Sequence, residues 1–347
     1  MSYRNLGTTG VKVSPLTLGA MMFGAWGNSD HDESIRIIHR ALDAGINVID
    51  TADVYARGES EEIVGKAIKG RRDEVVLATK FHGAMDDHDP NQGGNSRRWI
   101  IREVESSLRR LATDYIDLYQ VHRPRPETDI DDTLGALSDL VHQGKIRYIG
   151  TSTFLPSQIV EAQWVAERRN RERPVTEQPP YSILARGVER DVLPTADKHG
   201  LGILPWSPLA GGWLSGRYRR GEPAPVSSRQ QHQPARHDPN SLSNASKLEA
   251  VYQLTELADQ AGVSLIHLAL AFVLEHPAVS SAIIGPRTPT QLESQLGAEK
   301  ITLSQDVLDR IDEIVPPGKT INDADRGYSP PSLLEPAQRR RSAKAAG

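Results

Sequence analysis

Residues 47–80 read NVIDTADVYARGESEEIVGKAIKGRRDEVVLATK, and this stretch decides the fold. It holds a short β-branched run at 47–50, an amphipathic helical pattern at 59–69 and a second apolar run at 74–80. Apolar runs of this length are typical of buried strands, and apolar positions three and four residues apart are typical of a helix packed on a sheet. The stretch therefore predicts a strand–helix–strand unit, the building block of a parallel sheet.

The same alternation continues along the whole chain. Further strands are expected at residues 16–19, 115–122, 146–152, 175–178, 203–206 and 281–284. Helices are expected at 32–44, 101–111, 133–143, 190–199 and 247–261, after Pro156, and on either side of the last strand. Eight strand–helix units in series predict an α/β fold of the closed (β/α)8 TIM-barrel class.

A doubly wound open sheet is the structural competitor. Such a sheet usually carries its phosphate-binding glycines as GxGxxG after the first strand. Residues 19–24 read GAMMFG and do not match that pattern, so the barrel is favoured.

We expect one domain spanning residues 1–347. Three of its segments do not follow the alternation of strands and helices. Gly7-Thr8-Thr9-Gly10 lies between alternating residues and predicts an N-terminal β-hairpin within residues 1–15, placed as a plug on the barrel floor. Residues 217–246 are polar and follow the seventh strand, which predicts either a lid over the catalytic face or a disordered loop. Residues 329–347 contain three consecutive arginines and predict a mobile tail.

Composition narrows the classes of function. The chain has 347 residues and no cysteine, which excludes disulfides, iron–sulfur clusters and thiol catalysis. Its net charge is −4, from 41 basic and 45 acidic residues. This balance does not point to binding of nucleic acid or of a membrane surface. The expectation is a soluble cytoplasmic protein; its oligomeric state stays open.

Four reactive side chains fall at the ends of three successive strands: Asp50, Tyr55 five residues later, Lys80 and His122. Active sites of (β/α)8 barrels lie at the carboxyl ends of the strands. A lone lysine or histidine at a strand end is more often structural. The evidence for an active site is therefore that all four side chains occur at neighbouring strand ends.

The chemistry of this cluster suits the reduction of a carbonyl group. A tyrosine hydroxyl has an ordinary pKa of about 10, and a neighbouring Lys80 ammonium is expected to lower it. Asp50 would keep Lys80 charged, and His122 could donate a hydrogen bond to an oxygen on which negative charge develops. Tyr55 would then deliver the proton to the carbonyl oxygen.

No side chain donates hydride, so a nicotinamide cofactor is required. The later strand ends supply elements that could bind it, although each alone could be an ordinary turn. Trp206 offers a flat face for a nicotinamide ring, and Arg287 lies just before a helix, where phosphate is favoured. The scattered histidines form no His-x-His pair, so no metal is expected.

These motifs together resemble the aldo-keto reductase superfamily, over nearly the whole chain from Leu6 to about Val315. The resemblance rests on Asp50-Thr51-Ala52-Asp53-Val54-Tyr55, Thr79-Lys80, His122, Gly150-Thr151-Ser152-Thr153-Phe154, Gln178 with Tyr181-Ser182, Trp206-Ser207-Pro208-Leu209, and Gly285-Pro286-Arg287 with Gln291. It implies a catalytic tetrad of Asp50, Tyr55, Lys80 and His122. It also implies a cofactor, usually NADPH, bound without a Rossmann motif.

The resemblance assigns cofactor contacts residue by residue. Ala20, Met21 and Asp50 would approach the nicotinamide, Ser152 and Gln178 would hold its carboxamide, and Trp206 would stack on it. Ser207, Pro208, Leu209, Ala210 and Gly211 would line the pyrophosphate, with Arg217 in the lid region. Gly285, Arg287, Gln291 and Gln295 would hold the adenosine phosphate, and Arg287 favours NADPH over NADH.

Departures from the family pattern occur at Thr153, Arg217 and Ser294-Gln295, and none touches the tetrad. Two alternatives to a reductase of small-molecule carbonyl compounds stay open. Potassium channel β subunits share the fold and the Trp-Ser-Pro-Leu motif, so the chain could be a cofactor-binding regulatory subunit with little turnover. A barrel enzyme in which Lys80 forms a Schiff base is the other.

Overall fold

The protein is a (β/α)8 barrel. The computed structural model describes residues 1–223, 230 and 233–340. Eight parallel strands pair in the order β10-β3-β4-β5-β6-β7-β8-β9. Their bounds are β3 Leu16–Gly19, β4 Val48–Asp50, β5 Val76–Phe81, β6 Ile116–Val121, β7 Ile146–Ser152, β8 Pro174–Gln178, β9 Gly202–Ile203 and β10 Ala282–Ile284. Parallel bridges Ile203–Val279 and Trp206–Ile283 join the two ends of this order. The fold predicted from the alternating pattern is confirmed.

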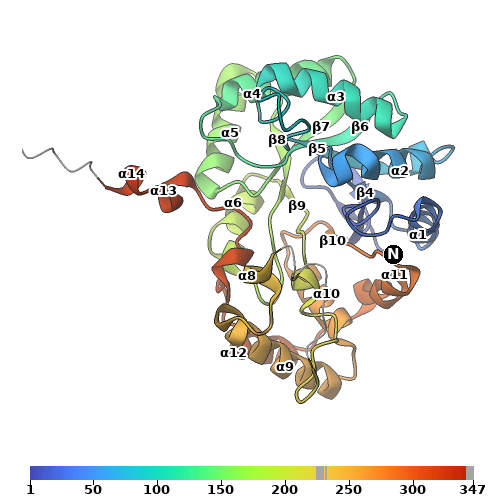
Figure 1. The fold of residues 1–347 in the computed structure, drawn as a ribbon, viewed down its shortest axis with the longest axis vertical. Helices are drawn as coiled ribbons and strands as arrows, with labels where there is room; N and C mark the ends of the chain where they lie inside the picture. The colour runs from blue at the N-terminus through green and yellow to red at the C-terminus, as the bar shows by residue number, and fades with distance from the viewer. Residues whose placement is uncertain (224–229, 231–232, 341–347) are drawn as a thin grey trace, which may run out of the picture.

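Helices surround the sheet on its outer side (Figure 1). They are α1 His31–Asp43, α2 Glu59–Ala67, α3 Arg97–Leu111, α4 Ile130–His142, α5 Pro156–Arg169, α6 Val192–Lys198, α9 Ala245–Gln260, α10 Leu265–Glu275, α11 Pro289–Gln295 and α12 Gln305–Ile314. Several begin at a side-chain cap: Asp30, Ser96 and Ser264 each accept a backbone N–H of the first turn. The helix α12 was not expected from the sequence.

The seventh barrel strand is shorter than predicted. The sequence suggested residues 203–206, whereas β9 spans only Gly202–Ile203. Pro205 has no N–H to donate to a ladder, so regular pairing stops before it. Its carbonyl still accepts the Ile283 N–H at 2.9 Å, which keeps the strand end beside β10.

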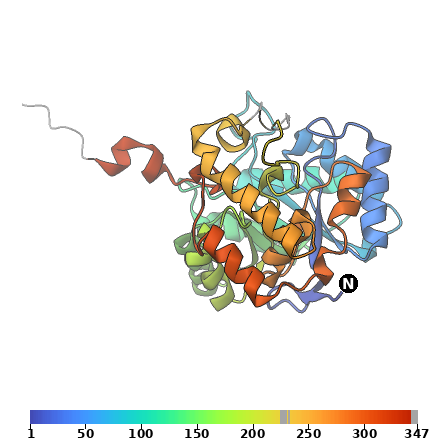
Figure 2. The ribbon, with the colours of Figure 1, turned by 90° about the horizontal axis from the view of Figure 1, so that it is seen from below.

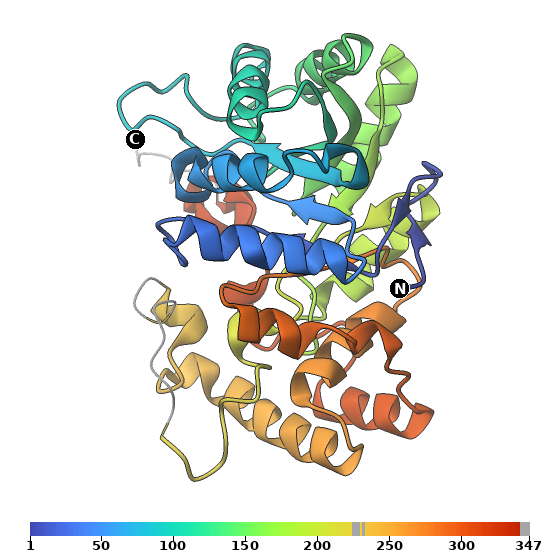
Figure 3. The ribbon, with the colours of Figure 1, turned by 90° about the vertical axis from the view of Figure 1, so that its right-hand side faces the viewer.

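The N-terminal hairpin forms as predicted. β1 Arg4–Asn5 pairs antiparallel with β2 Lys12–Val13. Leu6 and Val13 are buried in one cluster with side chains of the barrel interior, namely Val48, Ala78, Leu118, Leu204 and Ile283. Figures 2 and 3 place the hairpin at the opposite end of the molecule from the long segment that precedes α9. The hairpin therefore covers the barrel floor.

The segment predicted as a lid, residues 217–246, is only partly described, because 224–229 and 231–232 lie outside the described residues. The described part contains α8 Pro234–His237 and the 3-10 turn η5 Leu242–Asn244. It contacts the barrel through the Trp213 indole N–H, which donates to the Arg236 carbonyl at 3.0 Å. Whether it acts as a lid stays a prediction.

The chain returns to the barrel after α12. Thr320 forms an antiparallel bridge with Ala185, and Asp325 pairs with Lys247 at 2.5 Å. Beyond it, α13 Pro331–Leu334 and α14 Pro336–Arg339 bury no residue and project from the body (Figure 1). The predicted tail 329–347 includes residues 341–347, which lie outside the described residues, and its mobility stays a prediction.

Among the described residues, no single helix is long and apolar enough to cross a membrane. The stretches Leu242–Gln260 and Leu265–Glu275 meet the criteria of length and composition only as a pair, and that pair is bent by 94°.

Candidate active site

The barrel brings Asp50, Tyr55 and Lys80 together at the carboxyl ends of two adjacent strands. Asp50 ends β4, and Lys80 lies one residue before the end of β5. Tyr55 begins the short turn η1 Tyr55–Gly58. The chain turns sharply after Tyr55, because Ala56 and Arg57 adopt left-handed conformations at φ 48° and 54°. Each costs about 1–2 kcal/mol in a residue with a β carbon, so packing around the site holds this turn in place.

Lys80 is the centre of the cluster and is fully buried. Its Nζ lies 2.5 Å from Asp50 Oδ1, 2.8 Å from the Thr51 carbonyl oxygen and 3.4 Å from the Tyr55 hydroxyl. The Asp50 carboxylate overcomes the effect of burial and raises the pKa of Lys80. An ammonium is therefore held in hydrogen-bond reach of the tyrosine oxygen.

The second oxygen of Asp50 is held by two amides. Gln120 Nε2 and Gln178 Nε2 donate to Asp50 Oδ2 at 3.0 Å and 2.9 Å. Gln178 also donates to Gln120 Oε1 at 3.1 Å. The resemblance assigned Gln178 to the cofactor carboxamide, but in the structure its amide nitrogen orients Asp50. Gln120 was missed, although it lies two residues before His122 on the same face of β6.

Lys80 acts on the pKa of Tyr55 in the expected direction, but burial outweighs it, and the net shift is upward. The charge of Lys80 is visible in the sequence, whereas the burial of the Tyr55 hydroxyl depends on the fold. A hydroxyl with a raised pKa stays protonated at neutral pH, which is the state that a proton donor needs.

His122 lies directly after β6 and faces Tyr55 edge-on, with ring centroids 5.7 Å apart at 83°. Burial, and then the charges of Lys80 and Arg123, hold the pKa of His122 well below its ordinary value of 6.5. The imidazole is therefore neutral at pH 7, and one of its nitrogens carries a hydrogen that it can donate.

The resemblance placed a pyrophosphate cradle after β9, and the backbone there is unusual. Ser207, Ala210 and Gly211 all have positive φ, at 61°, 50° and 68°. The remaining cradle residues Pro208 and Leu209 are buried and half-buried. A backbone that turns in this way presents N–H groups to one side, a geometry suited to anions. Arg217 is exposed, and its guanidinium lies close to Gly212.

The two ends of the expected cofactor site hold buried polar atoms with no hydrogen-bond partner among the described residues. They are Trp206 Nε1 and Gln295 Oε1. An unpaired buried polar atom costs about 1–3 kcal/mol, so both are suited to meet a ligand. The residues present therefore fit an extended nicotinamide dinucleotide.

The adenosine end is formed by the loop before α11. Gly285 and Arg287 are exposed, Gln291 is half-buried, and Gln291 Oε1 accepts the Arg287 N–H at 2.9 Å. Asn28 Nδ2 donates to the Arg287 carbonyl at 2.9 Å and ties this loop to the one after β3. That loop starts at Ala20, which is buried, and Met21, which is half-buried. The nicotinamide-side residue Ser152 is buried, and its hydroxyl donates to the Gln178 carbonyl at 2.8 Å.

Comparison with known proteins agrees with this geometry. The model of the Aldo/keto reductase family matches residues 15–316. The chain belongs to that family. It is 40% identical to the aldo-keto reductase YhdN of Bacillus subtilis over 85% of this chain and 87% of the relative. It is 39% identical to the uncharacterized oxidoreductase YrpG of the same organism, over 91% and 96%.

A plant relative carries a different kind of name. The chain is 38% identical to a probable voltage-gated potassium channel subunit beta of Arabidopsis thaliana, over 91% of this chain and 97% of the relative. The relatives of this chain thus carry both reductase and channel-subunit names.

Glu177 and Arg123 also lie within this aldo/keto reductase site, and the sequence reasoning missed both. Glu177 is fully buried at the end of β8, next to Gln178. Its carboxyl accepts the Thr151 hydroxyl at 2.5 Å and the Phe154 N–H at 3.2 Å. Burial raises its pKa to about 7. These bonds fix the loop after β7, where Thr153 has a positive φ of 57°.

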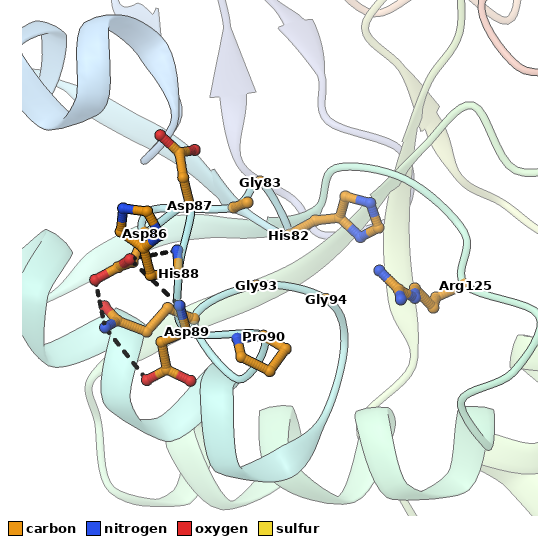
Figure 4. A pocket seen from close by; sticks show the side chains of 12 residues that line it. His82, Gly83, Asp86, Asp87, His88, Asp89, Pro90, Gly93, Gly94 and Arg125 are labelled. Carbon is orange, nitrogen blue, oxygen red and sulfur yellow. Dashed lines mark hydrogen bonds between the residues drawn. The ribbon is translucent and has the colours of Figure 1, made fainter.

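One cavity lies beside the tetrad, in the loop that follows β5. It measures about 640 Å³ and is lined by residues 82–84, 86–90 and 92–94, which follow β5, together with Arg125 (Figure 4). A β carbon on Gly83 would meet Val54 at 2.5 Å, so the cavity wall adjoins the Tyr55 turn.

Of the aromatic side chains near the site, Trp26 alone is exposed, at 50%, with its ring 6.0 Å from that of Tyr55. Phe23, Phe81 and Trp99 are buried in the interior and do not line an open pocket.

Proposed function

We propose that this chain reduces an aldehyde or ketone to an alcohol with NADPH, and that Tyr55 donates the proton to the carbonyl oxygen. The observation that carries this proposal is the position of the Tyr55 hydroxyl, 3.4 Å from the buried, paired ammonium of Lys80. Its substrates would be small-molecule carbonyl compounds, and its location the cytoplasm.

The side chains divide the work. His122 is neutral and donates a hydrogen bond to the carbonyl oxygen, which orients the substrate and stabilises developing negative charge. Tyr55 gives up its proton to the same oxygen. Lys80 stabilises the phenolate that remains, and Asp50, held by Gln120 and Gln178, keeps Lys80 in place. The nicotinamide, when bound, supplies the hydride.

Several residues at the rim of the barrel support the binding of a dinucleotide cofactor there. The positive-φ backbone at Ser207, Ala210 and Gly211 would face the pyrophosphate. The buried Trp206 Nε1 and Gln295 Oε1, which no described residue hydrogen-bonds, would meet the cofactor. Arg287, exposed beside the N-terminus of α11, would pair with a 2′-phosphate. This favours NADPH over NADH.

The test is NADPH oxidation followed at 340 nm (the absorbance of reduced nicotinamide) with a panel of aldehydes and ketones. Turnover of at least one class with wild-type protein, and its loss in Tyr55→Phe, supports the proposal. Tight NADPH binding with no turnover of any compound contradicts it.

A cofactor-binding regulatory subunit is the second candidate, favoured by the 38% identity to a plant protein named as a channel subunit. The same assay separates the two. A regulatory subunit binds NADPH but shows no carbonyl-dependent turnover, whereas the reductase shows both.

A further inference from the structure

Arg123 follows His122 and forms no ion pair with any residue that the structure describes. Its Nη1 donates to the His122 carbonyl oxygen at 2.7 Å and to Ser152 Oγ at 3.5 Å. Within residues 1–223, 230 and 233–340, no carboxylate lies within 4.0 Å of its guanidinium nitrogens. Nε and Nη2 likewise have no hydrogen-bond acceptor in that part of the chain.

Arg4 is also half-buried without a carboxylate partner, but its Nη1 donates to two backbone carbonyl oxygens, those of Leu274 and Val279. Four other buried or half-buried arginines have carboxylate partners. Arg72 pairs with Asp117, Arg110 with Glu61 and Glu103, Arg186 with Glu189 and Asp312, and Arg236 with Asp325. The fold thus supplies counter-charges to arginines that it withdraws from water, in accordance with the cost of an unpaired buried charge. Arg123 is an exception, and it lies next to the reacting groups.

The electrostatic surroundings of Arg123 leave its charge unneutralised. Burial is the main influence on this group and lowers its pKa, and the charge of Arg236 acts in the same direction. A guanidinium nevertheless keeps its proton in proteins. The Tyr55 hydroxyl, and then the Glu177 carboxyl, act on its pKa in the opposite direction. That carboxyl is already bound by Thr151 and Phe154, and with a pKa of about 7 it is only partly ionised at neutral pH.

Arg123 also acts on the substrate side of the site. Its charge influences both the Tyr55 hydroxyl and the His122 ring. The Nη1 contacts with the His122 carbonyl oxygen and with Ser152 Oγ place the guanidinium at the same strand ends as the tetrad. A planar fork with unused N–H donors at this position matches a carboxylate better than any neutral group.

We infer that Arg123 binds a carboxylate on the substrate, so that this enzyme acts on aldehydo or oxo acids in preference to neutral carbonyl compounds. The inference rests on the proposed reductase function. The substrate carboxylate supplies the negative charge that no described residue provides to Arg123. His122 and Tyr55 act on the carbonyl group of the same substrate, a few bonds away.

The test compares substrates that differ only in charge: the ortho, meta and para isomers of carboxybenzaldehyde and their methyl esters. Wild-type protein should show a higher kcat/KM for at least one acid than for its ester, and added salt should reduce that preference. Arg123→Gln should raise KM for that acid roughly 10- to 100-fold, the effect of losing a charge-assisted hydrogen bond. It should change KM for the ester less than about 3-fold. Arg123→Lys should recover part of the preference.

Two measurements separate this role from others. The affinity for NADPH should be unchanged in Arg123→Gln, and a parallel loss would mean that Arg123 serves the cofactor. Arg173→Gln, at the start of β8 on the barrel floor, is the matched control and should behave as wild type. No preference for any acid in the wild type, or equal losses for acid and ester in Arg123→Gln, would overturn the inference. Esters reduced with full dependence on Tyr55 would then leave the proposed function intact. If Arg123→Gln fails to fold, the wild-type acid preference and its salt dependence decide.

Discussion

The ammonium of Lys80 lies 2.5 Å from a carboxylate oxygen of Asp50, and both side chains are almost completely withdrawn from solvent. The pair bridges two neighbouring strands, β4 and β5, at their carboxyl ends. It positions a positive charge beside the Tyr55 hydroxyl, so the stability of the pair and the chemistry of the site are coupled.

Breaking this pair from one side should be costly. Lys80→Met leaves Asp50 buried with only the amides of Gln120 and Gln178, and should lower the free energy of unfolding by about 3 kcal/mol. Asp50→Asn combined with Lys80→Met should lose less than the sum of the two single changes, by at least about 1 kcal/mol. Urea denaturation of the four proteins measures this. Strictly additive losses would show that the two groups do not interact.

The pH dependence of carbonyl reduction should follow Tyr55 and not His122. Burial raises the pKa of Tyr55 above 10.0, so its hydroxyl stays protonated near neutral pH. The value of kcat/KM should therefore be constant from about pH 6 to about 9 and fall only at higher pH. The pKa of His122 lies well below 6.5, so no change is expected near that pH. A decline centred near pH 6.5 that disappears in His122→Gln would contradict this reading.

Glu177 should make the fold less stable as pH rises through the acid range. Its pKa rises from 4.5 in the unfolded chain to about 7 in the fold, so the folded state binds the extra proton between these values. The contribution is full below pH 4.5 and is lost by pH 7; a rise of this size in a buried carboxyl amounts to about 3 kcal/mol. Glu177→Gln should flatten this part of the stability profile.

The control for Glu177 is Glu161→Gln, an exposed position on α5. It should leave the profile of stability against pH as in the wild type. If Glu177→Gln kept the wild-type slope between pH 4.5 and 7, the assigned proton uptake would be wrong.

Arg287→Ala should weaken binding of NADPH by about 10- to 100-fold and that of NADH by less than about 2-fold, because only NADPH carries the 2′-phosphate. Fluorescence titration with both cofactors measures the two affinities. Arg310→Ala, exposed on α12, serves as the control with unchanged values. Equal losses for both cofactors would place the 2′-phosphate elsewhere.

Patterns local to the sequence predicted the barrel and the proximity of Asp50, Tyr55, Lys80 and His122, because both depend on period and strand order. Asp50 and Lys80 meet because each falls at the end of an apolar run, and parallel neighbours align such ends. The N-terminal hairpin could be predicted from Gly7 and Gly10 because turn glycines are also a local signal. Pro205 was equally visible and should have shortened the seventh strand.

Features that depend on tertiary partners could not be read in this way. Nothing in the order of residues says that Gln178 faces Asp50, or that burial outweighs Lys80 at the Tyr55 hydroxyl. The sequence also contains many arginines, and only the fold shows that Arg110 has carboxylate partners and Arg123 none among the described residues. Residues 316–328 run back to the barrel and bring Gly327 against Trp206. Their sequence has no apolar periodicity from which this path could be predicted.

The proton-donor role of Tyr55 is most directly tested by single-turnover hydride transfer in Tyr55→Phe, with NADPH bound and a reactive aldehyde in excess. We predict that this variant binds NADPH with wild-type affinity, because its phenyl ring keeps the contacts with Trp26 and His122. Its rate of NADPH oxidation should fall by at least about 100-fold, the lower range for loss of a general acid. Hydride transfer at the wild-type rate in folded Tyr55→Phe would contradict the account.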